Sequence, residues 1–277
     1  MSPRTLADAY DLLAEGGWTP IAGGTDLMVR ITGEIGEPPA RMLDIWHLDE
    51  LRGITQRDGW LVIGALATYT DLRRSDLVGT WLPGLADAAA TIGAAQIQNR
   101  GTIGGNIVNA SPAGDTLPVL LATDARIVLG GARGERSVAA ADFWTGYRMT
   151  ARAEDELVLR VEVPLPPGRE VRFRKVGTRR AQAISKVVMA LAWVPDRSGA
   201  WRDVRVAFGS IAAVPVRLPE VESVLDGATV DAQAAERARA ALEASIRPID
   251  DVRSTADYRR DVSGRILVRL LRGAGGW

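Results

Sequence analysis

A long run of glycine and small polar residues, residues 99–115, constrains this fold more than any other feature of the sequence. The run reads NRGTIGGNIVNASPAGD and interrupts a chain that is otherwise rich in apolar residues. No helical or strand periodicity survives between residues 96 and 115, so we expect a structured loop there. Long loops inside compact domains usually bind something. The rest of the fold must therefore be arranged around a ligand-binding segment.

The chemical content of this run favours binding over catalysis. Gly101, Gly104 and Gly105 expose the backbone to close approach by a ligand. Neutral hydrogen-bonding side chains accompany them, namely Thr102, Asn106, Asn109 and Ser111. Asp115 adds a carboxylate of the kind that binds sugar hydroxyls. Together these groups suit a dinucleotide.

A second, shorter glycine loop lies near the N-terminus. Residues 22–27 read AGGTDL and separate an apolar, strand-like run at 18–22 from a helical pattern at 27–31. Free N–H groups at the start of a helix attract anions, although Gly-Gly-Thr-Asp is also an ordinary turn with a helix cap. Neither loop matches G-x-G-x-x-G, and no G-x-x-x-x-G-K-[ST] occurs, so we expect neither a Rossmann site nor a P-loop.

Hydrophobic periodicity predicts the remaining elements. Helical patterns cover residues 5–15, 82–92, 221–225, 232–246 and about 254–271. Strand-like runs cover residues 42–46, 61–65, 127–129, 157–163, 171–176, 187–193 and 204–208, the last two being antiparallel. Alternation of strand and helix favours an α/β arrangement in the N-terminal part. The proline and glycine cluster at residues 164–168 places a domain boundary near residue 168.

Composition excludes several classes of function. Lysine plus arginine and aspartate plus glutamate both number 34, so we expect no binding to nucleic acid or to an anionic membrane. The chain has no cysteine, which excludes disulfides and thiolate-bound iron–sulfur clusters within it. Its one histidine, His47, reads as a turn residue, so no metal site is expected. No stretch matches a signal peptide or membrane span, which predicts a cytoplasmic protein.

The two glycine segments carry a family resemblance. AGGTDL (22–27) and RGTIGGNIVNASPAGDTLPVLLATDA (100–125) resemble the FAD-binding medium subunit of the xanthine dehydrogenase and carbon monoxide dehydrogenase family, the molybdenum hydroxylases. Weaker similarity covers 41–54, 61–72 and 183–193. The resemblance implies an α+β fold with a two-subdomain, vanillyl-alcohol-oxidase-type FAD-binding domain at 1–168, its subdomains covering about 1–55 and 56–168. A smaller C-terminal domain of antiparallel sheet plus helices then covers 169–277.

The same resemblance assigns cofactor-binding residues and no catalytic side chain. It places the FAD pyrophosphate against two groups of residues: Ala22, Gly23, Gly24, Thr25, Asp26 and Leu27, and Thr102, Ile103, Gly104, Gly105 and Asn106. Asn109 and Asp115 match positions near the ADP-ribityl part, and Lys186 matches a lysine near the flavin. This chain departs from some bacterial relatives at Gln182, where they place a tyrosine against the flavin ring.

In such complexes a molybdopterin-binding large subunit transforms the organic substrate, and a small subunit with two two-iron clusters relays electrons. The flavin subunit passes the electrons to an acceptor such as NAD or oxygen. A quinone or a carrier protein is an alternative acceptor. The resemblance implies a dimer of heterotrimers. The alternatives are a stand-alone FAD oxidoreductase and a non-enzymatic scaffold that binds through the basic residues Arg169, Arg172, Arg174, Lys175, Arg179 and Arg180.

Overall fold

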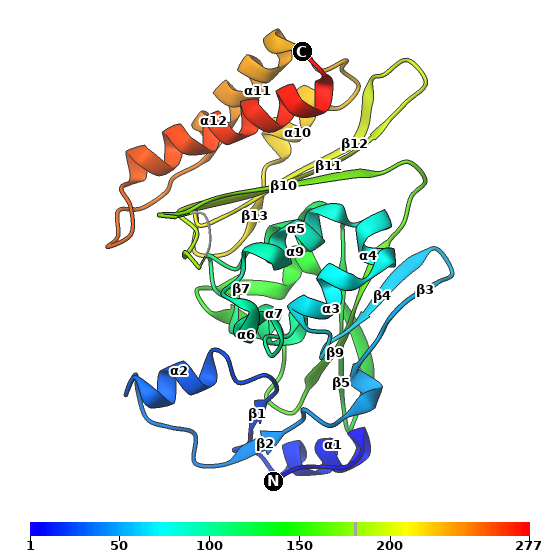
Figure 1. The fold of residues 1–277 in the computed structure, drawn as a ribbon, viewed down its shortest axis with the longest axis vertical. Coiled ribbons are helices and arrows are strands. Elements are labelled where there is room, and N and C mark those ends of the chain that lie inside the picture. The colour runs from blue at the N-terminus through cyan, green and yellow to red at the C-terminus, as the bar shows by residue number, and fades with distance from the viewer. Residues whose placement is uncertain (180–181) are drawn as a thin grey trace.

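The structure is a computed structural model that describes residues 1–179 and 182–277, so that Arg180 of the basic stretch lies outside the described residues. The chain forms an α+β fold in which two antiparallel sheets are each accompanied by helices (Figure 1). The N-terminal unit lies at one end of the molecule and the C-terminal helices at the other. This arrangement confirms the predicted fold class.

The N-terminal unit is a small strand–helix–strand motif preceded by a helix. Its elements are α1 (Leu6–Ala14), β1 (Thr19–Ile21), α2 (Leu27–Thr32) and β2 (Met42–Asp44). Thr5 caps α1, because its side chain accepts from the Asp8 amide while the Asp8 carboxylate accepts from the Thr5 amide. Strands β1 and β2 are parallel, and the first glycine loop connects β1 to α2. The predicted α/β arrangement is correct for this unit.

The larger sheet is antiparallel throughout, which the α/β prediction did not anticipate. Its strands are β3 (Ile54–Arg57), β4 (Trp60–Gly64), β5 (Arg126–Gly131), β6 (Gly134–Ala139) and β9 (Leu157–Pro164). They lie in the order β3-β4-β9-β5-β6. The prediction was wrong here because the helices after β4 do not form a crossover to a parallel neighbour. They form an insertion, and β9 returns antiparallel between β4 and β5.

The inserted helices include most of the glycine-rich segment. They are α3 (Tyr69–Arg74), α4 (Asp76–Trp81), α5 (Pro83–Thr91), α6 (Ala95–Gln98), α7 (Ile103–Asn109) and α8 (Leu117–Ala122). The expectation of a structured loop over residues 96–115 was therefore wrong in its centre. Gly104 and Gly105 hide the helical period of α7, but the Thr102 hydroxyl caps the helix by accepting from the Gly105 amide at 3.1 Å.

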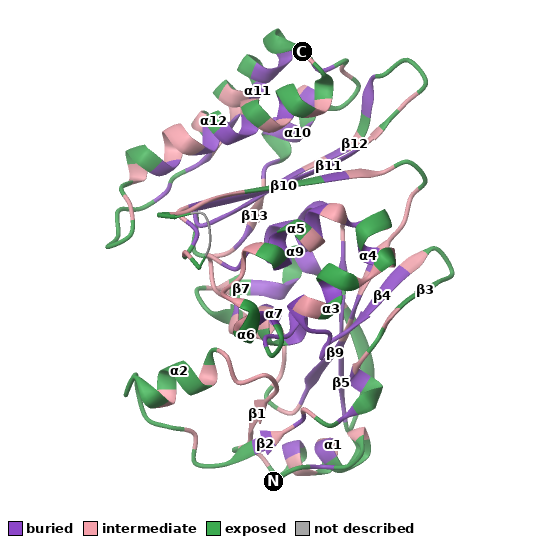
Figure 2. Ribbon diagram, in the orientation of Figure 1, coloured by how far each residue is buried: buried purple, intermediate pink, exposed green. Residues whose placement is uncertain are grey.

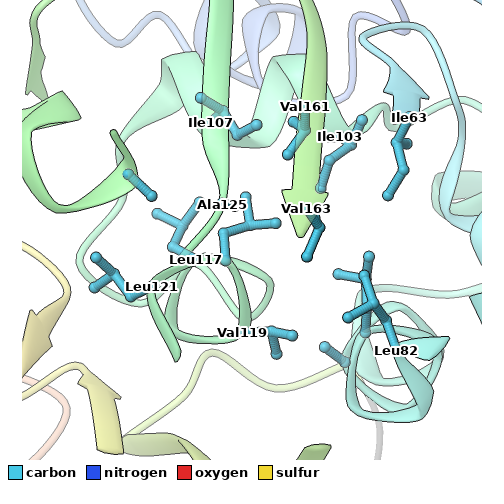
Figure 3. Packing of buried hydrophobic residues seen from close by; sticks show 14 of the residues in the cluster. Ile63, Leu82, Ile103, Ile107, Leu117, Val119, Leu121, Ala125, Val161 and Val163 are labelled. Atoms are coloured by element: carbon cyan, nitrogen blue, oxygen red, sulfur yellow. The ribbon is translucent and has the colours of Figure 1, made fainter. Parts of the chain in front are cut away.

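Helix α7 presents one apolar face to the core. Ile103 and Ile107 are fully buried and pack in one cluster with Val161 and Val163 of β9 (Figure 3). Burial of each such side chain contributes roughly 1.5–3 kcal/mol, so this face outweighs the poor helix propensity of the two glycines. The opposite side of α7 is left facing the first glycine loop.

The C-terminal sheet is packed on both faces. Its strands are β10 (Glu170–Val176), β11 (Val187–Pro195), β12 (Trp201–Gly209) and β13 (Val216–Arg217), followed by α10 (Pro219–Leu225), α11 (Ala232–Ser245) and α12 (Ala256–Gly275). Helices α10 and α12 contact one face, and α5 and α8 contact the other. Strand β11 is consequently buried along almost its whole length (Figure 2), which explains its continuous apolar sequence. The predicted antiparallel strands and helices are confirmed.

A short hairpin completes the described elements. Helix α9 (Ala140–Phe143) leads into β7 (Trp144–Gly146) and β8 (Met149–Thr150), and a single 3₁₀ turn covers Asp49–Leu51. The indole Nε1 of Trp144 donates to the carbonyl of Ile107 at 3.1 Å and so ties the hairpin to α7. In the described part of the chain no helix is both long enough and apolar enough to cross a membrane.

A buried ion pair joins the α7–α8 connection to the C-terminal sheet. Lys175 Nζ of β10 lies 2.5 Å from Asp115 Oδ2, and the two side chains are only 10% and 6% exposed. The Ser185 hydroxyl donates to the other carboxylate oxygen. Burial raises the pKa of the Asp115 carboxyl, and Lys175 lowers that pKa in part. The positive charge of Lys175 thus stabilises the ionised, buried carboxylate of Asp115.

We predict that Lys175→Met destabilises the protein by about 3–5 kcal/mol, because it leaves a buried carboxylate without its cation. Folding would then raise the pKa of Asp115 further above its unfolded value, so the native state loses stability as pH rises above the ordinary aspartate range. Urea unfolding should show a larger deficit near pH 7 than near about pH 4.

The matched control is Arg133→Met. This substitution breaks the ion pair between Arg133 and Asp155, in which the Arg133 side chain is 74% exposed. We expect it to cost no more than about 1 kcal/mol at either pH. Equal losses for the two variants would show that the Lys175–Asp115 pair does not secure this junction.

Candidate functional site

Both glycine segments border one cavity of about 340 Å³ between the N-terminal unit and the larger sheet. Its walls come from β1 and the loop after it, the connection from β4 to α3, helix α7, the β7–β8 hairpin and the start of β9. Clefts of this size with a few converging polar groups are typical of cofactor sites. Eleven of the residues predicted from the sequence line it: Ala22, Gly23, Gly24, Thr25, Asp26, Leu27, Thr102, Gly104, Gly105, Asn106 and Asn109.

The first glycine loop provides unused backbone donors. The backbone N–H groups of residues 23–27 have no hydrogen-bond partner among residues 1–179 and 182–277. Gly23 lies so close to the Arg100 carbonyl that a Cβ there would be 1.7 Å from its oxygen, and Gly24 has a left-handed φ of +75°. Only glycine fits at Gly23, and successive free amides of this kind form an anion-binding concavity.

The amides of the second segment are already occupied. In the first turn of α7, Ile103 donates to the Ala67 carbonyl and Gly104 to the Ala65 carbonyl, each at 2.9 Å. A Cβ on Gly104 would lie 2.8 Å from Ala65. Helix α7 is therefore a closely docked wall of the cavity, while the free anion-binding amides belong to the first loop.

A string of hydrogen bonds connects three segments at the cavity. Asn109 Nδ2 donates to Asp26 Oδ1 at 2.9 Å, and Arg148 Nη1 of the hairpin donates to Asn109 Oδ1 at 2.7 Å. Burial raises the pKa of Asp26, whereas Arg148 and the Asn109 hydrogen bond lower that pKa in part. The string joins the first glycine loop, the end of α7 and the turn between β7 and β8.

The charge on the cavity wall is predominantly positive. Arg30, Arg148 and Arg152 line the cavity, and none of them forms a salt bridge with any residue that the structure describes. The lining acids are Asp26 and Glu156, and Glu156 is neutralised by an ion pair with Arg136 at 2.6 Å. A multiply charged anion such as a pyrophosphate is the kind of ligand that this balance favours.

Sequence reasoning missed these arginines, because no local motif marks them. Tyr69, which also lines the cavity, was missed for the same reason. Its ring packs so closely against Gly101 that a Cβ there would lie 2.6 Å from Cε2. Burial raises the pKa of the Tyr69 phenol, and the charges of Asp26 and Asp115 raise it further. Tyr69 therefore stays protonated and serves as a neutral wall.

Three of the predicted residues lie away from the cavity lining. Ile103 is fully buried in the core, and Asp115 is engaged with Lys175 and Ser185 at the junction with the C-terminal sheet. Lys186 Nζ lies 4.8 Å from the centre of the Tyr258 ring on α12. Gln182 and His47 do not line the cavity either. Within the described residues no group of three or more histidine, cysteine or acidic residues could hold a metal ion.

Comparison with known protein families assigns this fold and site to a class. The model of the FAD binding domain in molybdopterin dehydrogenase matches residues 1–166, and that of the CO dehydrogenase flavoprotein C-terminal domain matches residues 172–274. The chain belongs to the family of FAD-binding flavoprotein subunits of molybdopterin dehydrogenases. The predicted family membership is confirmed.

Individual relatives cover nearly the whole chain. The glyceraldehyde dehydrogenase medium chain of Sulfolobus acidocaldarius is 35% identical over 88% of this chain and 85% of its own length. The carbon monoxide dehydrogenase medium chain of Hydrogenophaga pseudoflava is 32% identical, covering 99% and 95% respectively.

Solved structures agree with this relationship. Carbon monoxide dehydrogenase from Hydrogenophaga pseudoflava aligns with a TM-score of 0.91 at 30% identity over 97% of this chain and 93% of that chain. Quinoline 2-oxidoreductase from Pseudomonas putida 86 aligns with a TM-score of 0.93 at 24% identity over 99% and 95%, a likeness of fold.

We predict that Gly23→Ala displaces the first loop from Arg100 and costs about 1–3 kcal/mol of stability, because the added methyl group would overlap a backbone carbonyl. The control is Gly79→Ala on α4, where a Cβ meets nothing within 4 Å and alanine should stabilise the helix by roughly 0.5–1 kcal/mol. Thermal and urea unfolding measure both. A Gly23→Ala protein as stable as the control would contradict the close approach of the two backbones.

Proposed function

We propose that this chain is the flavin subunit of a multi-subunit molybdenum-containing dehydrogenase, in which it binds FAD and passes electrons to an external acceptor. The observation that carries this proposal is the cavity between the two glycine segments. It combines backbone amides at residues 23–27 with three arginines, and within the described part of the chain these amides are free and these arginines form no salt bridge. This combination fits the pyrophosphate of a dinucleotide cofactor.

The residues at the cavity fit the cofactor that the family binds. The amides of residues 23–27 would bind the pyrophosphate, and Thr102, Gly104, Gly105 and Asn106 would form the opposite wall. Asn109 and Asp115 are proposed near the ADP-ribityl part, and Lys186 near the flavin. We also propose domains at 1–168 and 169–277, with subdomains of about 1–55 and 56–168. The change of sheet between Pro164 and Glu170 supports this division.

When bound, FAD supplies the redox chemistry, since it accepts and releases electrons. The chain contributes binding, orientation and control of access. We assign no catalytic side chain to it. Of the polar groups at the cavity, Asp26 is hydrogen bonded to Asn109, and Tyr69 is buried with a raised pKa. Work on the organic substrate is therefore assigned to another subunit.

The proposed partners follow from the family and from the composition of the chain. The chain contains no cysteine and so cannot bind iron–sulfur clusters through thiolates. We assign two two-iron clusters to a small subunit and molybdopterin to a large subunit, assembled as a dimer of heterotrimers in the cytoplasm. Relatives that are medium chains or FAD subunits of dehydrogenases support a complex of this kind. NAD or oxygen is the proposed acceptor.

The alternatives receive less support. The named relatives are subunits of dehydrogenases, which does not favour a stand-alone FAD oxidoreductase. The scaffold alternative needs its basic stretch to form an open surface. Arg169 is instead only 7% exposed and pairs with Asp203, and Lys175 is buried against Asp115. Arg169 and Lys175 are therefore engaged within the chain and do not contribute to an open basic surface.

We predict that the purified chain is yellow and releases FAD in near-stoichiometric amount on denaturation, because one cavity of the required character is present. The visible absorption spectrum before and after denaturation measures this. The isolated chain should not oxidise the organic substrate of the complex. A colourless protein that also fails to take up added FAD would overturn the proposed function.

We further predict that Gly104→Val yields protein without flavin. The valine side chain would collide with Ala65 and push α7 away from the cavity wall. Gly79→Val on α4 is the matched control, because a side chain there meets open space. Circular dichroism of both variants separates loss of the cofactor from loss of the fold. Full flavin content in folded Gly104→Val protein would show that α7 does not shape the site.

A further inference from the structure

We propose that Arg148 is an anion-binding residue of the cofactor site, directed at the FAD pyrophosphate and positioned by Asn109. This inference rests on the proposed function and assigns a role to a side chain that no sequence motif identifies. Arg148 lies in the turn between β7 and β8, 122 positions after Asp26 in the sequence, and lines the same cavity.

The hydrogen bonds of Arg148 leave most of its donors unused. Its Nη1 donates to the side-chain and main-chain oxygens of Asn109, at 2.7 and 3.5 Å. Its Nε and Nη2 have no partner in residues 1–179 or 182–277. A guanidinium carries five N–H donors in a planar fork that matches phosphate oxygens. The remaining donors are therefore available to a ligand in the cavity.

Asn109 keeps the guanidinium from pairing with the nearby carboxylate. Its amide accepts from Arg148 with the oxygen and donates to Asp26 with the nitrogen, so it lies between the two charges. No salt bridge forms between Arg148 and Asp26. Asp26 belongs to the loop whose amides are free, which places the Arg148 charge beside that anion-binding concavity.

The backbone at Arg148 gives a second, independent argument. Arg148 has a φ of 55°, in the left-handed region that glycine adopts most easily. An arginine in this turn is strained where a glycine would not be, and such strain is concentrated at binding sites. Trp144 anchors the same hairpin to α7 through the Ile107 carbonyl, so the strained turn is fixed in place over the cavity.

Arg152 provides a useful contrast on the same wall. Its Nη1 donates to the carbonyls of Ala153, Glu154 and Glu156 and so organises the turn that precedes β9. Burial lowers the pKa of Arg152. Arg152 thus has a structural role in its own turn, whereas the hydrogen bonds that Arg148 makes with the described residues go to Asn109, which already faces the glycine loop.

The experiment titrates apo-protein with FAD, ADP and riboflavin separately and follows binding by calorimetry. Arg148→Met keeps the length of the side chain without its charge, and it should weaken FAD and ADP binding roughly 10- to 100-fold, as expected for charged hydrogen bonds. Riboflavin, which has no phosphate, should bind as it does to the wild type. Arg148→Lys should recover part of the loss, and Arg133→Met should bind all three ligands normally.

Arg148→Gly separates binding from folding. Because glycine relieves the left-handed strain, this apo-variant should melt at or above the wild-type temperature and still bind FAD and ADP more weakly. A marked fall in its melting temperature with unchanged ADP binding would show a structural role and overturn the inference.

The outcomes also distinguish this inference from the proposed function. Wild-type FAD affinity in Arg148→Met would overturn the role of Arg148 and leave the flavin assignment intact. Equal weakening of riboflavin and ADP would overturn its assignment to the pyrophosphate. Failure of the wild-type chain to bind FAD would instead overturn the proposed function itself.

Discussion

The site depends on one close contact between backbones, the docking of the first turn of α7 on the connection between β4 and α3. Ile103 and Gly104 donate to the carbonyls of Ala67 and Ala65, and Gly104 leaves no space for a side chain. This contact fixes α7 against the larger sheet, where Ile103 and Ile107 enter the core. The opposite side of the helix is then held at a constant distance from the first glycine loop, and a cavity remains between them.

Much of the fold could be predicted from the sequence because periodicity reports burial on one face. The predicted helices at the two ends of the chain and the strands of the C-terminal sheet follow such patterns. Helix α7 was not predicted because Gly104 and Gly105 have no side chains with which to show a helical period. The direction of the larger sheet was not predicted either, because strand pairing between β4 and β9 joins residues about a hundred positions apart.

The candidate site was predictable to the extent that its chemistry is local. Residues 22–27 and most of 102–106 are contiguous and glycine-rich, and the structure brings them to one cavity. Arg148 and Arg152 could not be found in this way, because tertiary structure alone brings them to the cavity. Arg148 lies in a hairpin that Trp144 ties to α7, and Arg152 lies in the turn before β9. The positions of Asp115 and Lys186 likewise depend on the C-terminal sheet, which buries one carboxylate and sets the lysine beside α12.

Strand β11 has a consequence for how the molecule folds. Its alternate residues Val188, Ala190 and Ala192 belong to the core of the FAD-binding region, while Val187, Met189 and Leu191 belong to the core under α10–α12. Neither core is complete without this one strand. The proposed domain boundary near residue 168 therefore does not divide the chain into two units that unfold independently. The two regions should unfold as a single unit. A substitution in β11 must therefore fit the packing of both cores.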